Sequence, residues 1–104
     1  MEPSSVNDLD RLQRGVAAAW KSFDVATVNG NAVRFRVMED VTADWHVHDR
    51  SDEMFLAMSG TTYLDTEHAT HKLEAGQLFV VPAGTRHRAR VEGRATLLVV
   101  ADIG

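Results

Sequence analysis

Two periods of apolar and polar residues divide this chain into a short helical segment and a long strand-rich segment. Between residues 7 and 23 the apolar side chains recur at helical spacing, at Leu9, Leu12, Val16 and Trp20. Asn7 stands where a helix N-cap is expected, and Gly15 weakens the middle of the segment. We therefore predict a mobile tail at residues 1–5 and a covering helix at residues 7–23 that carries no chemistry of its own.

From about residue 25 the period changes to two, which predicts β-strands. The expected strands are Val33–Val37, Trp45–His48, Met54–Met58, Thr61–Asp65, Leu78–Val81, His87–Val91 and Thr96–Ala101. We expect Thr61–Asp65 to form a hairpin with Met54–Met58, and Pro82–Thr85 to form a type I turn. About seven or eight short strands with regular turns indicate an all-β sandwich or barrel over residues 25–104.

Three of these strands are apolar at consecutive positions instead of alternate ones. They are Met54–Met58, Leu78–Val81 and the last strand, which is apolar over Leu97–Ala101. An antiparallel barrel buries only one face of each strand, so a strand that is apolar on both faces needs a second cover outside. The predicted helix covers one region, and a second copy of the chain is the simplest cover for the rest. The pattern therefore favours a homodimer.

Length and composition restrict the classes of protein to which the chain can belong. With 104 residues it forms one domain, and its 44% apolar and 25% charged residues are a globular balance. The absence of cysteine excludes disulfides, cysteine zinc sites and thiol nucleophiles. A net charge of −4 gives no general attraction for nucleic acid or anionic membranes, and no export signal or membrane-spanning run is evident. We expect a cytoplasmic protein without nucleic-acid or membrane partners.

Histidines carry the candidate chemistry. His46 and His48 are two apart on a predicted strand, so both side chains leave the same face with Cα atoms roughly 6.5–7 Å apart. Glu53 follows a polar turn, and a closing barrel brings the remote His87 alongside. Three neutral imidazoles and a carboxylate suit one divalent first-row metal. Spacing alone does not separate such a site from surface or core histidines, or from the His-x-His zinc sites of the carbonic-anhydrase type.

Glycine and proline positions add a family resemblance. The pattern His46-x-His48-x4-Glu53-x6-Gly60, followed by Gly76-x5-Pro82-x-Gly84-x2-His87, resembles the two signature motifs of the cupin superfamily. The wider sequence around the first motif is similar to that of the small single-domain cupins described as phosphomannose-isomerase-like. The resemblance implies one jelly-roll domain over residues 1–104. It also implies metal-ligand roles for His46, His48, Glu53 and His87, and turn roles for Gly60, Gly76, Pro82 and Gly84.

Two positions depart from the family pattern. Asp40 stands where the first motif usually begins with a glycine, and Val91 stands where the second often ends with an asparagine. Neither departure removes a ligand. Both argue against a close match to the best-known cupin enzymes.

Because side chains alternate between the two faces of a strand, the sequence also predicts which residues line a pocket and which face the solvent. An apolar pocket beneath the metal is predicted from Phe55, Ala57, Ala89 and Val91, with Tyr63 as a further lining residue. His68 and His71 are expected to be solvated turn histidines. Arg34, Arg36, Arg86, Arg88 and Arg90 are expected on solvated faces, with a pocket for an anionic partner as the alternative.

The function expected from these residues is metal-dependent. Our first hypothesis is a mononuclear cupin that binds Fe, Mn, Ni or Zn and acts on a small oxygen-rich metabolite as a dioxygenase or isomerase. The second is a non-catalytic module that binds or senses a small molecule through the metal. The third is a structural dimer whose metal ties strands together. The sequence assigns no catalytic residue beyond the ligands.

Overall fold

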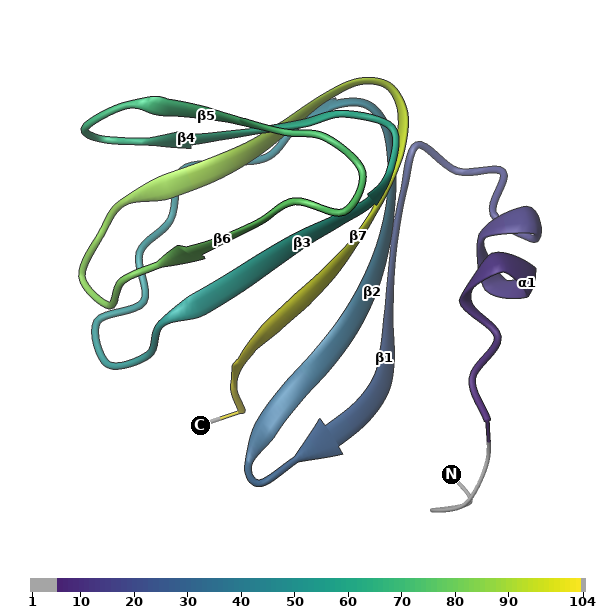
Figure 1. Cartoon of the computed structure of the whole chain (residues 1–104), viewed down its shortest axis with the longest axis horizontal. Coiled ribbons are helices and arrows are strands. Elements are labelled where there is room, and N and C mark those ends of the chain that lie inside the picture. Colours follow the sequence, from purple (N-terminus) through teal and green to yellow (C-terminus); the bar gives the residue numbers. More distant parts are fainter. Residues whose placement is uncertain (1–5, 104) are drawn as a thin grey trace.

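The structure is a computed structural model that describes residues 6–103, so the tail predicted at residues 1–5 lies outside the described residues. One helix precedes seven strands in this part of the chain. The elements are α1 (Leu9–Arg14), β1 (Trp20–Val28), β2 (Asn31–Thr42), β3 (Glu53–Ser59), β4 (Thr62–Thr66), β5 (Thr70–Leu73), β6 (Leu78–Val81) and β7 (His87–Asp102). The all-β jelly roll with a short N-terminal helix is therefore confirmed (Figure 1).

The roll is closed by the long strand β7, which belongs to both of its layers. One layer has the strand order β1-β2-β7-β3-β6, and the other is formed by β5, β4 and the first half of β7. All strand pairs are antiparallel. The first half of β7 pairs with β4 from His87 to Val91, and the second half pairs with β3 from Thr96 to Ala101. The two strands predicted around Glu92-Gly93 are thus one continuous strand.

The predicted helix at residues 7–23 is too long. The observed helix ends at Arg14, before Gly15, and Trp20 belongs to β1. The reason is that residues 20–28 pair with β2, where Phe23 and Val25 alternate with Ser22 and Asp24 and pack toward the second core, so the helical spacing of Trp20 is coincidental. The N-cap is Asp8, whose carboxylate accepts a hydrogen bond from the Arg11 amide, and not Asn7.

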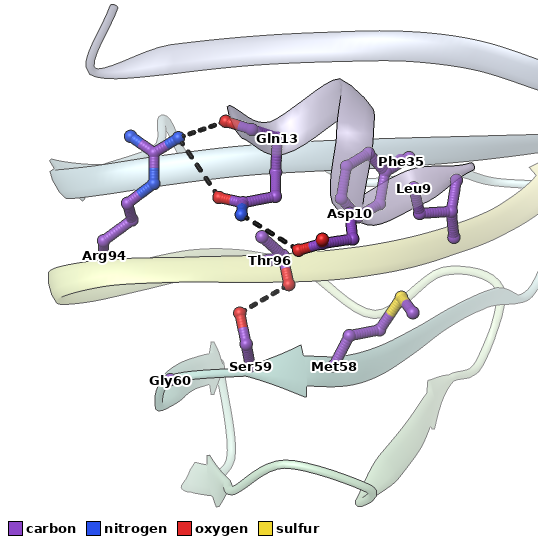
Figure 2. A pocket seen from close by; sticks show the side chains of 9 residues that line it. All are labelled: Leu9, Asp10, Gln13, Phe35, Met58, Ser59, Gly60, Arg94 and Thr96. Carbon is purple, nitrogen blue, oxygen red and sulfur yellow. Dashed lines mark hydrogen bonds between the residues drawn. The ribbon is translucent and has the colours of Figure 1, made fainter. Parts of the chain in front are cut away.

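The helix α1 packs on the outer face of the sheet, beside β1 and away from the β4–β5 hairpin (Figure 1). Its apolar side covers a small second core of Val25, Phe35 and Val37. Arg94 fixes the end of the helix because one of its nitrogens donates to the carbonyl of Gln13 at 2.6 Å and to that of Val16 at 3.1 Å. Figure 2 shows the resulting cavity between α1 and strands β3 and β7. The polar side chains that line this cavity form hydrogen bonds with one another or with the helix.

The hairpin predicted between Met54–Met58 and Thr61–Asp65 does not form. Strand β3 pairs with β6 and β7, whereas β4 pairs with β5 and β7. The chain crosses from one layer to the other at Gly60, where the backbone has φ 69° and lies against the Arg94 carbonyl. The main core lies inside the roll and contains Met38, Phe55, Ala57, Leu64, Leu73, Val81, Ala89, Val91, Ala95, Leu97 and Val99. No helix in residues 6–103 is long and apolar enough to span a bilayer.

Candidate metal centre

Two loops meet at one end of the roll and carry the candidate ligands. The β2–β3 loop and the β6–β7 loop lie together at the left of Figure 1. Backbone hydrogen bonds of 2.9 Å join His46 and His87 in both directions, and the Gly84 amide donates to the His48 carbonyl at 2.8 Å. The predicted strand Trp45–His48 is therefore reduced to a single bridge between His46 and His87.

The turn that presents His87 differs from the predicted type I geometry. The Thr85 amide donates to the Pro82 carbonyl at 3.1 Å, and Gly84 at the third position has φ 83°. A positive φ at this position is the mark of a type II turn, which favours glycine there. The carboxylate of Asp52 accepts a hydrogen bond from the Ala83 amide at 2.9 Å and joins the turn to the other loop.

Three imidazoles converge on one carboxylate oxygen. The Oε1 atom of Glu53 lies 2.7 Å from Nε2 of His87, 3.3 Å from Nε2 of His48 and 3.5 Å from Nε2 of His46. The four candidate ligand atoms lie within 4.8 Å of one another. Donors on a common ion, with bonds of about 2.1 Å, are separated by at most about 4.2 Å. To enclose one cation, the widest pairs must therefore move slightly closer, and the 2.7 Å contact between Glu53 and His87 must open to about 3 Å, the separation of neighbouring donors at 90° with such bonds.

Backbone carbonyls orient two of the imidazoles. The Nδ1 atom of His87 lies 2.8 Å from the Thr85 carbonyl oxygen, and Nδ1 of His46 lies 3.2 Å from that of Asp44. Because a carbonyl oxygen only accepts, each of these two Nδ1 atoms carries a proton, and each ring turns Nε2 toward Glu53. Such outer hydrogen bonds are usual for metal-binding histidines. The Nε2 atom of His48 is buried and has no hydrogen-bond partner, as expected for a nitrogen placed for a ligand absent from the structure.

The electrostatics of the cluster favour an ionised carboxylate. Burial alone would raise the pKa of Glu53, but hydrogen bonds from His46 and His87 hold it well below its usual range. The hydrogen bond to Glu53 is also the main reason why the pKa of His46 is raised, against the opposing effect of burial. A proton on Nε2 of His46 and a metal cation in the cluster would thus compete for the same lone pair.

One side of the cluster is open. The side chains of Glu53 and His87 are 3% and 1% exposed, whereas those of His46 and His48 are 38% and 42% exposed. A cation held by the four residues would therefore be anchored from the interior of the roll and reachable from the solvent.

The predicted pocket residues separate into two groups. Phe55, Ala57, Ala89 and Val91 are buried in the main core, and the Phe55 ring meets the His87 ring edge-on at 5.7 Å. Tyr63 points to the opposite face of β4, where the Arg90 guanidinium lies 4.9 Å from its ring. It therefore does not extend the apolar wall beneath the cluster.

Several of the residues predicted to be solvated have definite partners. His68 is exposed beside Glu67, but the ring of His71 stacks on Phe79 at 4.1 Å and is not simply solvated. Arg88 and Arg90 both bond to the buried carboxylate of Asp65, at 2.9 and 2.6 Å, so the expectation of a solvated edge is wrong for them. Arg36 is only partly exposed, and its side chain belongs to the interior-facing side of β2. Sequence reasoning missed this placement.

The two departures from the family motifs are accommodated without loss of a ligand. Asp40 adopts φ 48°, the left-handed conformation that explains a glycine at this position, and its carboxylate accepts a hydrogen bond from the Gly93 amide at 2.7 Å. Val91 is buried in the main core.

Comparison with known proteins agrees with the fold and the cluster. A family model described as "Cupin domain" matches residues 33–101. The chain belongs to the cupin family. Its match begins within β2 and includes all four residues of the cluster.

Relatives of this cupin span most of its length. It is 32% identical over 98 residues to the uncharacterized protein YdbB of Bacillus subtilis (strain 168). This alignment covers 93% of this chain and 86% of YdbB. A crystal structure of a cupin-2 domain containing protein from Shewanella frigidimarina NCIMB 400 matches with TM-score 0.83 and 22% identity, over 91% of this chain and 92% of that one. A cupin-superfamily sugar phosphate isomerase from Silicibacter pomeroyi DSS-3 matches with TM-score 0.66 and 23% identity, over 74% of this chain and 53% of that one. Both structural likenesses concern the fold alone.

Proposed function

We propose that this cupin binds one divalent transition metal through His46, His48, Glu53 and His87 and acts on a small oxygen-rich metabolite, as an isomerase or a dioxygenase. The observation that carries the proposal is the convergence of three imidazole Nε2 atoms on one Glu53 oxygen, with the ligand atoms within 4.8 Å of one another. When bound, the metal would supply Lewis-acid polarisation of a substrate oxygen, or O2 activation if it is Fe(II).

The residues around the cluster define what each part contributes. His87 and Glu53 are buried and held by the Thr85 carbonyl and the apolar core, so they fix the position of the cation. His46 and His48 border the solvent-facing side, so a substrate would approach past their rings. This asymmetry favours a site that takes up ligands over a metal that only ties strands together, because a structural site is closed on all sides.

A second candidate is a binding or sensing module without turnover. It is favoured by the apolar residues beneath the cluster, Phe55 and Ala89, which offer no acid or base for proton transfer. Incubation of metal-loaded protein with hydroxy acids and sugars, with oxygen uptake and product NMR as readouts, separates a dioxygenase, an isomerase and a module that only binds.

Metal analysis tests the centre itself. We expect one equivalent of metal in protein purified without an affinity tag, and a marked loss in His48→Ala and in His87→Ala with the fold retained. His68→Ala is the matched control, because this exposed histidine lies outside the cluster. Unchanged metal content in both cluster variants would contradict the proposed site.

We also propose that a second copy of the chain covers the outer faces of β3 and β6. Met58, Leu78 and Val80 are 39%, 56% and 45% exposed there, and α1 covers only the neighbouring part of the sheet. In the sheet formed by residues 6–103, β6 is the last strand of the order, so an edge of the sheet borders this apolar face. A symmetric pair would bury the same face on both copies.

A further inference from the structure

Arg36 lies on the interior-facing side of β2. Its register partner on β7 is Leu97, which is fully buried in the main core, whereas its chain neighbours Phe35 and Val37 face α1. Its guanidinium lies 5.6 Å from the ring of Trp20, which shares this face of the sheet from β1. A strongly polar side chain is thus held against the inner surface of the roll.

This guanidinium has no anionic partner among residues 6–103. Its Nε atom is shielded from solvent and makes no hydrogen bond, and no carboxylate forms an ion pair with it. The neighbouring arginine on the same face differs, because Nε of Arg34 donates to Asp24 at 2.9 Å. A shielded and unpaired donor is costly in a folded protein, and such a group commonly marks the place of a ligand.

The electrostatic environment connects Arg36 with the cluster. Burial lowers the pKa of Arg36, and the negative charge of Glu53 opposes this effect. The pKa of His46 is raised mainly by its hydrogen bond to Glu53, while the positive charge of Arg36 acts in the opposite direction. Arg36 therefore lies within electrostatic reach of both residues, and His46 borders the open side of the cluster.

We propose that Arg36 binds the carboxylate of the small molecule that occupies the metal centre, so that the ligand is a hydroxy- or oxo-carboxylate. This inference rests on the proposed function. A guanidinium presents paired donors that match a carboxylate, and binding one would satisfy the orphan Nε donor. The hydroxyl or carbonyl oxygen next to that carboxylate would then lie toward the four-residue cluster.

A matched pair of probes tests the charge requirement. Glycolate and glycolamide share the hydroxyl group, but only glycolate carries a carboxylate. Isothermal titration calorimetry of zinc-loaded protein should show that wild type prefers glycolate, and that Arg36→Gln weakens glycolate binding about tenfold while glycolamide binding is unchanged. Arg36→Lys, which keeps the charge but loses the paired donors, should fall between the two.

Arg34→Gln is the control, because Arg34 lies on the same face of β2 but already donates to the carboxylate of Asp24. It should leave glycolate binding unchanged. Equal glycolate affinity in wild type and Arg36→Gln at equal zinc content, or an equal loss of both probes, would overturn the inference alone. A wild-type protein that binds no zinc would overturn the proposed function. Inorganic phosphate bound more tightly than glycolate, with the same dependence on Arg36, would replace the carboxylate by a phosphate.

Discussion

Glu53 is the side chain on which the chemistry of the centre depends. It is almost fully buried, yet its pKa is held well below the usual range because the imidazoles of His46 and His87 satisfy its charge despite burial. A proton on His46 and a metal cation stabilise the same carboxylate, so they compete for it. The centre is thus a proton-or-metal site, and pH should decide which of the two occupies it.

The raised pKa of His46 determines the direction in which zinc affinity should change with pH. With the proton retained to higher pH than on a free imidazole, apparent zinc affinity should fall as the pH is lowered from about 8 to about 6, by up to about tenfold per pH unit for each proton displaced. In metal-free protein the same residue contributes stability below its unfolded pKa of about 6.5, and loses it as the pH rises through the higher folded pKa.

Zinc titrations and thermal melts of wild type and His46→Gln at several pH values measure both effects. The wild-type advantage in melting temperature should shrink with rising pH when zinc is absent and grow with rising pH when zinc is bound. A parallel pH dependence in the two states would contradict the competition.

The four clustered residues could be predicted from sequence because their spacing and the flanking glycines are local features of the motifs. Tyr63 and Arg36 could not be placed in the same way. Whether these two side chains point into the roll or away from it depends on which face of β4 and β2 becomes the inner face. The pairing of these strands with β7, which is distant in the chain, decides this. On β2 both faces are covered, one by α1 and one by the roll, so parity alone assigned Arg36 to the solvent.

Among the strands, β7 holds the two layers together, and Asp65 reinforces its contact with β4. The Asp65 carboxylate accepts hydrogen bonds from Arg90 and Arg88 on β7 and from Thr70 on β5. The hydrogen bond from Arg90 is the main cause that holds the pKa of Asp65 well below its usual range. A carboxylate with a lowered pKa contributes stability above its unfolded pKa, and this stability is lost as the pH falls.

We therefore expect Asp65→Asn to lower the free energy of unfolding by about 2–3 kcal/mol at neutral pH. The difference from wild type should shrink as the pH falls below about 4, because the unfolded chain then takes up a proton on Asp65 while the folded protein, with its lowered pKa, still keeps the carboxylate charged. Denaturant unfolding at a series of pH values measures this. Asp24→Asn is the control, because Asp24 also bonds an arginine but its side chain is 82% exposed, so its effect should be much smaller. Equal effects of the two substitutions would argue against a buried network.

The crossing between layers at Gly60 gives a second test of the strand arrangement. A Cβ atom there would lie 2.3 Å from the Arg94 carbonyl oxygen, and the backbone has φ 69°. Gly76 has φ 88° but open space around it. Gly76→Ala should cost about 1 kcal/mol for the left-handed backbone alone, and Gly60→Ala about 1–3 kcal/mol more for the steric overlap. Denaturant unfolding of both variants measures the difference, and equal costs would contradict the tight crossing.

The sequence predicted most strands of the roll but not how they pair. Periodicity is a local signal, and it located β2, β3, β4 and β6 within a few residues. The Ser59-Gly60 pair predicts a hairpin turn, whereas in the structure the chain passes close to Arg94 at Gly60 and enters the other layer. That contact joins residues far apart in the chain, so no local pattern reports it.

For the molecule as a whole, the apolar outer face of β3 and β6 is the main feature that a single copy leaves uncovered. The register places Met54 opposite Val80 and Leu56 opposite Leu78, so these side chains form one continuous face. The consecutive apolar residues of both strands are thereby explained, since one face fills the roll and the other faces outward. A homodimer would bury this outer face and remove its exposure to water.

Substitution of exposed residues on this face tests the dimer without disturbing the core. Leu78→Lys and Val80→Lys should convert a dimeric wild type to a monomer, because a dimer would have to bury the lysine charges. The monomer itself should lose little stability, since both side chains are largely exposed in a single copy. Val28→Lys is the matched control, because Val28 is 55% exposed on β1, which lies at the opposite end of the sheet order from β6. Sedimentation velocity and thermal melts measure mass and stability together. A monomeric wild type, or a dimer that survives both lysine substitutions, would show that a second copy does not cover this face.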